Sequence, residues 1–155
     1  EPPTVMIIQW STWEREEWYH QGQWYQVNAS GMDMVPPELS QRYKSYIAGI
    51  DWNAKMLEAH RDIWQLHLEL QAKNLCHVFY NSWCTFADVP PDQRQNWGAN
   101  YIDPYDADRS YASVLKSKGF LPSQGYHFGE DGHRFWADYV LEYLLSHNLI
   151  QPCAT

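Results

Sequence analysis

Two histidines six residues apart, His127 and His133, lie in segment 123–144, beside two carboxylates and just before an amphipathic run. His127 follows a glycine-containing loop, and an imidazole there can take up and release a proton near neutral pH. His127 is therefore our candidate general base, and the simpler alternative is an exposed loop histidine without a chemical role. His133 falls in the first turn of the expected helix, where packing or hydrogen bonding explains it better.

A general base needs a nucleophile and a group that holds its ring in place. Ser82 follows the apolar run 75–80 and is a candidate nucleophile, while Asn81 beside it could donate a hydrogen bond to a ligand. Ordinary turn chemistry is the alternative for both residues. Gln124, three residues before His127, could fix the tautomer of the imidazole but could not stabilise imidazolium by charge.

Three further residues are candidates for binding a substrate. Ser11 and Trp13 directly follow the apolar run 4–10, and ligands of open α/β sheets gather at the carboxyl ends of strands. Trp24 belongs to the aromatic segment 20–36, which we expect to be a long loop that serves as a lid or a platform for a sugar. A packed Ω-loop without a binding role is the alternative.

Neither a metal nor a cofactor is expected. The two histidines and Asp131 match no established zinc spacing, and no Cys-x-x-Cys pair occurs among Cys76, Cys84 and Cys153. Three cysteines leave one over in any disulfide scheme, so reduced thiols and a cytoplasmic location are the expectation.

Short apolar runs alternate with longer amphipathic stretches along the chain. The runs predict strands at 4–10, 75–80 and 99–102. Ser11 with Glu14 reads as a capping box and predicts a helix over 11–19. Further helices are expected at 37–48, 52–73 after the cap Asp51, 107–118 before Gly119, and 130–147. This order predicts one α/β domain over residues 1–155, a three-layer α/β/α arrangement around a short parallel sheet.

Several segments resemble the SGNH (GDSL-type) hydrolases. The sequences NYID at 100–103, GYHFG at 125–129 and GHRFWA at 132–137 resemble the C-terminal end of that family, and TVMIIQWSTWE at 4–14 resembles its central strand and the block that follows. The resemblance implies a flavodoxin-like fold and an esterase, lipase or carbohydrate deacetylase. It also implies that His127 is the base.

The chain departs from the family pattern at three places. No Gly-Asp-Ser nucleophile block precedes residue 4, Trp13 stands where the family has its oxyanion-hole Asn, and Gln124 replaces the Asp that orients the base. The first strands of the family fold are thus missing from this sequence. In the family's strand order their absence leaves the strand at 4–10 on an open apolar edge, which predicts a homodimer.

The composition excludes some classes of binding partner. The net charge of −8 has the wrong sign for a nucleic-acid binder, and no apolar run approaches the length of a membrane span. Nine Trp and eleven Tyr suit a sugar or planar ligand as well as a core. We therefore expect an esterase or deacylase that acts on a small-molecule or glycan ester. The alternative is a non-catalytic SGNH-like domain that binds a glycan or a protein partner.

Overall fold

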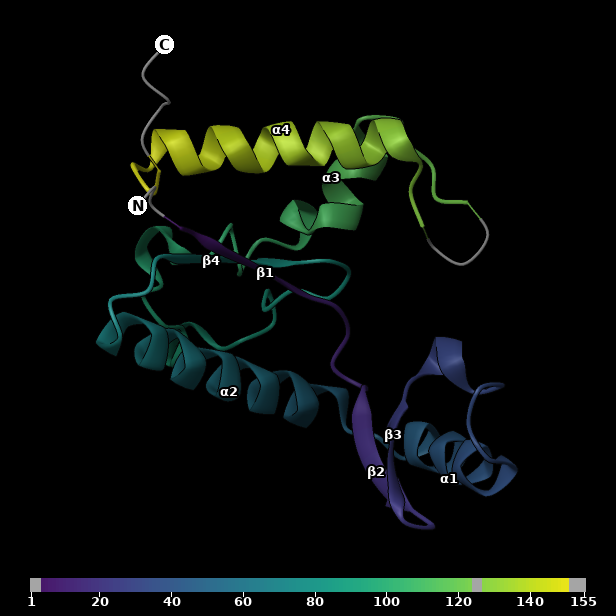
Figure 1. Cartoon of the computed structure of the whole chain (residues 1–155). Coiled ribbons are helices and arrows are strands. Elements are labelled where there is room, and N and C mark those ends of the chain that lie inside the picture. Colours follow the sequence, from purple (N-terminus) through teal and green to yellow (C-terminus); the bar gives the residue numbers. More distant parts are fainter. Residues whose placement is uncertain (1–3, 124–126, 151–155) are drawn as a thin grey trace.

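The computed structural model describes residues 4–123 and 127–150 (Figure 1). Its strands are β1 (Met6–Trp10), β2 (Glu16–His20), β3 (Gln23–Val27) and β4 (His77–Asn81). Its α-helices are α1 (Pro37–Ala48), α2 (Trp52–Ala72), α3 (Tyr111–Ser117) and α4 (Glu130–Ser146).

The central sheet is short and parallel. β1 pairs with β4 in register from Met6 opposite His77 to Trp10 opposite Asn81. On the other side of β4, Phe79 forms an isolated parallel bridge with Tyr101. The strands expected at 4–10 and 75–80 are confirmed. The strand expected at 99–102 is reduced to this single bridge, because a 3-10 turn occupies Gly98–Asn100.

Helices pack against both faces of this sheet, because consecutive side chains of a strand point to opposite faces. Val78 joins a buried cluster with residues of α3 and α4. Its neighbour Phe79 joins a second cluster with residues of α2. Figure 1 shows α2 on one side of β1 and β4, and α3 and α4 on the other. The α/β class is confirmed in this general sense.

The expected helix over 11–19 is wrong, and so is the expected loop over 20–36. Both stretches contribute to an antiparallel hairpin of β2 and β3. The left-handed backbone of Gln21 (φ 47°) and Gly22 (φ 91°) makes the tight turn that such hairpins need. Glu14 does not cap a helix, since its carboxylate accepts a hydrogen bond from the Thr12 hydroxyl at 2.8 Å.

The other helices agree with the sequence prediction apart from their ends. Asp51 caps α2 by accepting a hydrogen bond from the Ala54 amide. The helix expected over 107–118 is divided into a 3-10 turn, Ala107–Arg109, and α3, which Ser110 caps through the Ser113 amide. Gly119 follows α3 with a φ of 86°, the conformation in which glycine commonly ends a helix.

One edge of β1 has no strand partner within the described residues. The Met6 amide donates to the Cys76 carbonyl and the Ser82 amide donates to the Trp10 carbonyl, so these backbone groups face β4. The alternation of a parallel ladder then turns the backbone groups of Ile7 and Gln9 away from β4. The Ile7 side chain is 49 % exposed. None of the helices in the described ranges is long and apolar enough to cross a membrane.

Candidate functional site

An open cleft of about 550 Å³ lies at the carboxyl end of β1, between the hairpin and the first half of α2. Ligands of open α/β sheets bind at this end of the strands. The lining residues come from β1, the following loop, β2, β3 and α2: Gln9, Trp10, Ser11, Thr12, Trp13, Arg15, Glu16, Gln26, Lys55, Glu58, Ala59, Asp62 and Ile63.

Two tryptophans of the cleft lining are fixed by the aromatic core behind them. The Trp13 ring stacks on Phe86, with centroids 4.9 Å apart and an interplanar angle of 4°. The Trp10 ring packs edge-on against Phe79 at 5.6 Å. The indole Nε1–H of Trp10 is buried and has no hydrogen-bond partner among the described residues. The cleft therefore presents aromatic surface that packs against the core, while the Trp10 Nε1–H points into the interior.

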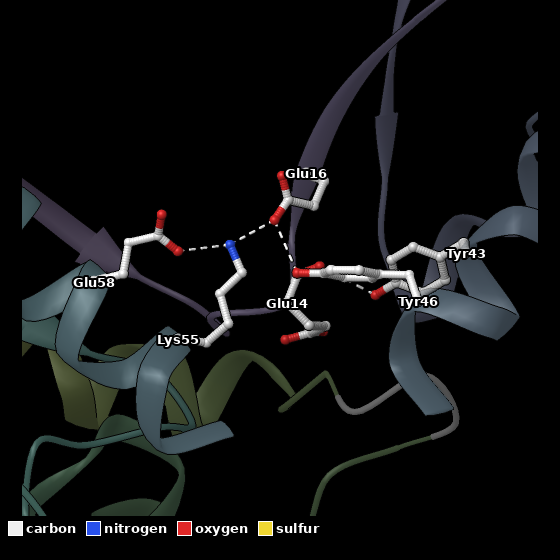
Figure 2. Close-up of polar contacts among 6 residues, drawn as sticks. All are labelled: Glu14, Glu16, Tyr43, Tyr46, Lys55 and Glu58. Atoms are coloured by element: carbon white, nitrogen blue, oxygen red, sulfur yellow. Dashed lines mark hydrogen bonds and ion pairs between the residues drawn. The ribbon is translucent and has the colours of Figure 1, made fainter. Parts of the chain in front are cut away.

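A charged network includes three further lining residues, Glu16, Lys55 and Glu58 (Figure 2). Lys55 Nζ lies 2.6 Å from Glu16 Oε1 and 2.8 Å from Glu58 Oε2. The Tyr46 hydroxyl donates to Glu16 Oε1 at 2.8 Å. These contacts join β2 to both α1 and α2, so they hold the hairpin in place beside the cleft.

The network also favours the ordinary charge states of Glu16, Lys55 and Tyr46 at neutral pH. Burial raises the pKa of Glu16, but hydrogen bonds from Lys55 and Tyr46 outweigh it and leave that pKa lowered. Burial lowers the pKa of Lys55, and its bonds to the two carboxylates outweigh this and leave it raised. Burial raises the pKa of Tyr46, and its hydrogen bond to Glu16 adds to this rise. Carboxylate, ammonium and protonated hydroxyl therefore coexist here.

The predicted binding residues lie in different surroundings. Ser11 and Trp13 line the cleft. Asn81 is buried at the end of β4, where its Oδ1 accepts a hydrogen bond of 2.6 Å from the Tyr101 hydroxyl. Its Nδ2 has no partner among the described residues. Trp24 is on the hairpin, 69 % exposed, and does not line the cleft.

Ser82 is only 3 % exposed. Its amide donates to the Trp10 carbonyl at 2.7 Å, and its carbonyl accepts from the Ala112 amide at 2.9 Å. These bonds tie the end of β4 to β1 and to the start of α3. A substrate could reach the Ser82 hydroxyl only if the surrounding structure moved.

His127 is exposed directly before α4. The next residue, Phe128, is buried and stacks on Trp83 with ring centroids 6.1 Å apart. Because Trp83 follows Ser82, this contact brings the histidine loop next to the carboxyl end of β4. No hydrogen bond joins His127 to Ser82 in the part of the chain that the structure describes. Gln124 lies outside the described residues.

The second histidine of the segment has a structural environment. His133 Nδ1 lies 3.2 Å from the Tyr111 hydroxyl, so α4 and α3 are joined at this point. Within 4–123 and 127–150, no three His, Cys, Asp or Glu side chains are grouped so that they could hold a metal ion.

Sequence reasoning missed Glu16, Tyr46 and Lys55, which meet from three separate elements. The available signal was the alternation of outward and inward residues on either side of Gln21-Gly22, which is typical of a hairpin. Comparisons with family models, curated proteins and solved structures found no match for this chain. A function has to be inferred from the geometry and chemistry of the site.

Proposed function

We propose that this chain is an SGNH-like hydrolase domain of the esterase or deacylase type, with a flavodoxin-like three-layer fold. The order of the parallel partners supports this proposal. In space, β4 lies between β1 and Tyr101, and the three also follow one another in this order along the sequence. The flavodoxin-like order, 2-1-3-4-5, ends in three such consecutive neighbours. The substrate class would be an acyl or acetyl ester, including one carried by a carbohydrate.

In this proposal His127 acts as general base at the carboxyl end of the sheet. It takes the proton from a serine hydroxyl as the oxygen attacks the ester carbonyl, and gives that proton to the departing oxygen, so that an alcohol leaves. Water, deprotonated by the same base, then attacks the acyl-enzyme, and the proton returns to the serine as the acid leaves. The burial of Ser82 favours a serine on strands that add to the open edge of β1 over Ser82 itself. Ser11 and Trp13 would contact the substrate, and Gln124 would orient the base. Asn81, like Ser82, is too buried for direct contact, so its part in this proposal would be to support the end of β4 through Tyr101.

Covalent labelling with a fluorophosphonate tests this activity on the full reading frame that contains the chain. We expect label on one serine, found by peptide mass spectrometry, and loss of that label in His127→Ala. His147→Ala is the matched control, because His147 is also an exposed histidine that the proposal does not use. Absence of label from the wild-type protein would contradict a serine hydrolase.

The cleft supports a second candidate, a non-catalytic SGNH-like domain that binds a glycan or a protein partner. Trp10 and Trp13 offer aromatic surface, and Ser11, Thr12 and Gln26 offer hydrogen bonds. This arrangement is typical of ligand sites and needs no nucleophile. The missing label described above, together with saturable ligand binding, would favour this candidate.

We also propose that two copies of the chain form a homodimer through the open edge of β1 when no preceding strands cover it. Light scattering should then give twice the chain mass, and Ile7→Lys should give a monomer, since a charge on an edge strand opposes pairing. Leu121→Lys is the control, because Leu121 is also exposed but lies outside β1. A monodisperse wild-type monomer would contradict the dimer.

The cytoplasmic location stays a prediction.

A further inference from the structure

The hairpin carries an exposed pair of aromatic rings next to the cleft. Tyr19 and Trp24 are cross-strand partners, 59 % and 69 % exposed, with ring centroids 5.4 Å apart at 60°. Gln26, two residues beyond Trp24 and thus on the same face of β3, lines the cleft. Residues two apart on a strand are separated by about 7 Å, so the aromatic pair lies one cross-strand pair beyond Gln26 on the same face of the hairpin.

The opposite face of the hairpin is anchored, so the pair does not stand on a loose loop. The Trp18 ring lies 6.0 Å from Tyr43 and 5.8 Å from Tyr46 of α1. The guanidinium of Arg42 lies 4.1 Å from the Trp18 ring centroid. Figure 2 shows the hydrogen bond from Tyr46 to Glu16 that ties the same helix to β2. A ligand on Tyr19 and Trp24 would therefore not have to order this surface.

The charges of the cleft select against a strongly charged ligand. Three carboxylates and two cations line it, a balance of one negative charge, and Lys55 is already paired with Glu16 and Glu58. The Tyr19–Trp24 pair by itself is too small to bind a protein partner, because two rings offer far less than the roughly 800 Å² that each side of a stable interface buries. A neutral oligosaccharide combines flat apolar faces with many hydroxyl groups, which fit the two rings and the polar side chains of Ser11, Thr12 and Gln26 in the cleft lining.

We propose that the Tyr19–Trp24 face is a second subsite, so that cleft and hairpin together bind one linear neutral oligosaccharide. This inference rests on the proposed carbohydrate ligand of the cleft. One part of the oligosaccharide occupies the cleft at Trp10 and Trp13, and a more distant sugar unit stacks on Trp24. The binding affinity then grows with the length of the oligosaccharide until both places are filled.

Isothermal titration calorimetry with two ladders tests the subsite: β-1,4-linked glucose and β-1,4-linked N-acetylglucosamine, each from disaccharide to hexasaccharide. For at least one ladder, we expect wild-type affinity to rise with length. Trp24→Ala should weaken the hexasaccharide by about tenfold and leave the disaccharide unchanged. Trp52→Ala is the matched control, an exposed tryptophan that does not line the cleft, and should bind both as wild type does. Circular dichroism should show that both variants fold.

The outcomes separate the two proposals. If wild type binds and Trp24→Ala binds every length equally well, the second subsite is refuted while a carbohydrate ligand of the cleft stands. If wild type binds neither ladder at any length, the neutral oligosaccharide is refuted as the ligand. Neither result alters the fluorophosphonate labelling, which reports on the hydrolase activity alone.

Discussion

Phe79→Ala is expected to lower the free energy of unfolding by about 3–5 kcal/mol, because it removes a fully buried ring and leaves a cavity. The ring lies at the centre of the sheet, 5.0 Å from His77, 5.6 Å from Trp10 and 5.6 Å from Tyr101. The packing of β1, of β4 and of the bridge at Tyr101 therefore depends on this ring. In a chain of this size the melting temperature should fall by roughly 10 °C, measured by circular dichroism.

Leu68→Ala provides the control for this substitution. Leu68 is 40 % exposed on α2, so its truncation removes far less buried surface and should change stability by only about 1 kcal/mol on the scale of about 25 cal/mol per Å². A Phe79→Ala variant as stable as Leu68→Ala would mean that the packing between α2 and the sheet is not as described. The same variant should weaken ligand binding, since Trp10 in the cleft rests on Phe79.

The elements that sequence predicts best are those whose own residues determine them. α2 is an example, because its apolar positions recur at helical spacing over many turns and Asp51 supplies the cap. The hairpin shows the opposite case. Ser11 and Glu14 have the spacing of a capping box, yet the alternation from Glu16 to Val27 around Gln21-Gly22 determines the structure. The longer pattern prevails because cross-strand pairing stabilises every residue of it.

The residues of the candidate site also fall into two groups, those that the sequence could place in the site and those that it could not. Ser11 and Trp13 could be placed in the site from sequence, since they follow an apolar strand and strand ends hold ligands. Lys55, Glu16 and Tyr46 could not, because their meeting depends on how the hairpin, α1 and α2 pack together. No local spacing encodes a contact between residues about thirty to forty positions apart. Trp24 falls in the predicted loop 20–36, whereas in the structure it pairs with Tyr19 across the hairpin.

Acid should destabilise the fold through buried histidines of the α2 side of the sheet. His67 and His77 are each 1 % exposed, and His67 Nδ1 lies 2.9 Å from His77 Nε2. His77 Nδ1 lies 2.8 Å from the Leu75 carbonyl, which assigns its proton to Nδ1 and leaves Nε2 to accept from His67. This hydrogen bond joins two buried rings of α2 and β4.

The direction of the pH effect follows from the lowered pKa values. Burial lowers the pKa of His67, and electrostatic repulsion between it and the neighbouring His77 lowers it further; burial also lowers the pKa of His60. Below about pH 6.5, the ordinary value, the unfolded chain binds protons that the folded chain does not. Stability is therefore fully present above that pH and declines as the pH falls, by at most about 1.4 kcal/mol per pH unit for each group.

Melting temperatures measured between pH 7.5 and pH 5.5 should show this decline for the wild type. His67→Gln should lower stability at pH 7.5 but flatten the pH dependence, because it removes one titrating ring from the core. His147→Gln, which changes an exposed histidine, should keep the wild-type slope. Carboxylates titrate mainly below this window, so they cannot produce the difference between the two variants. Equal slopes in the wild type and His67→Gln would show that protonation of His67 is not linked to unfolding.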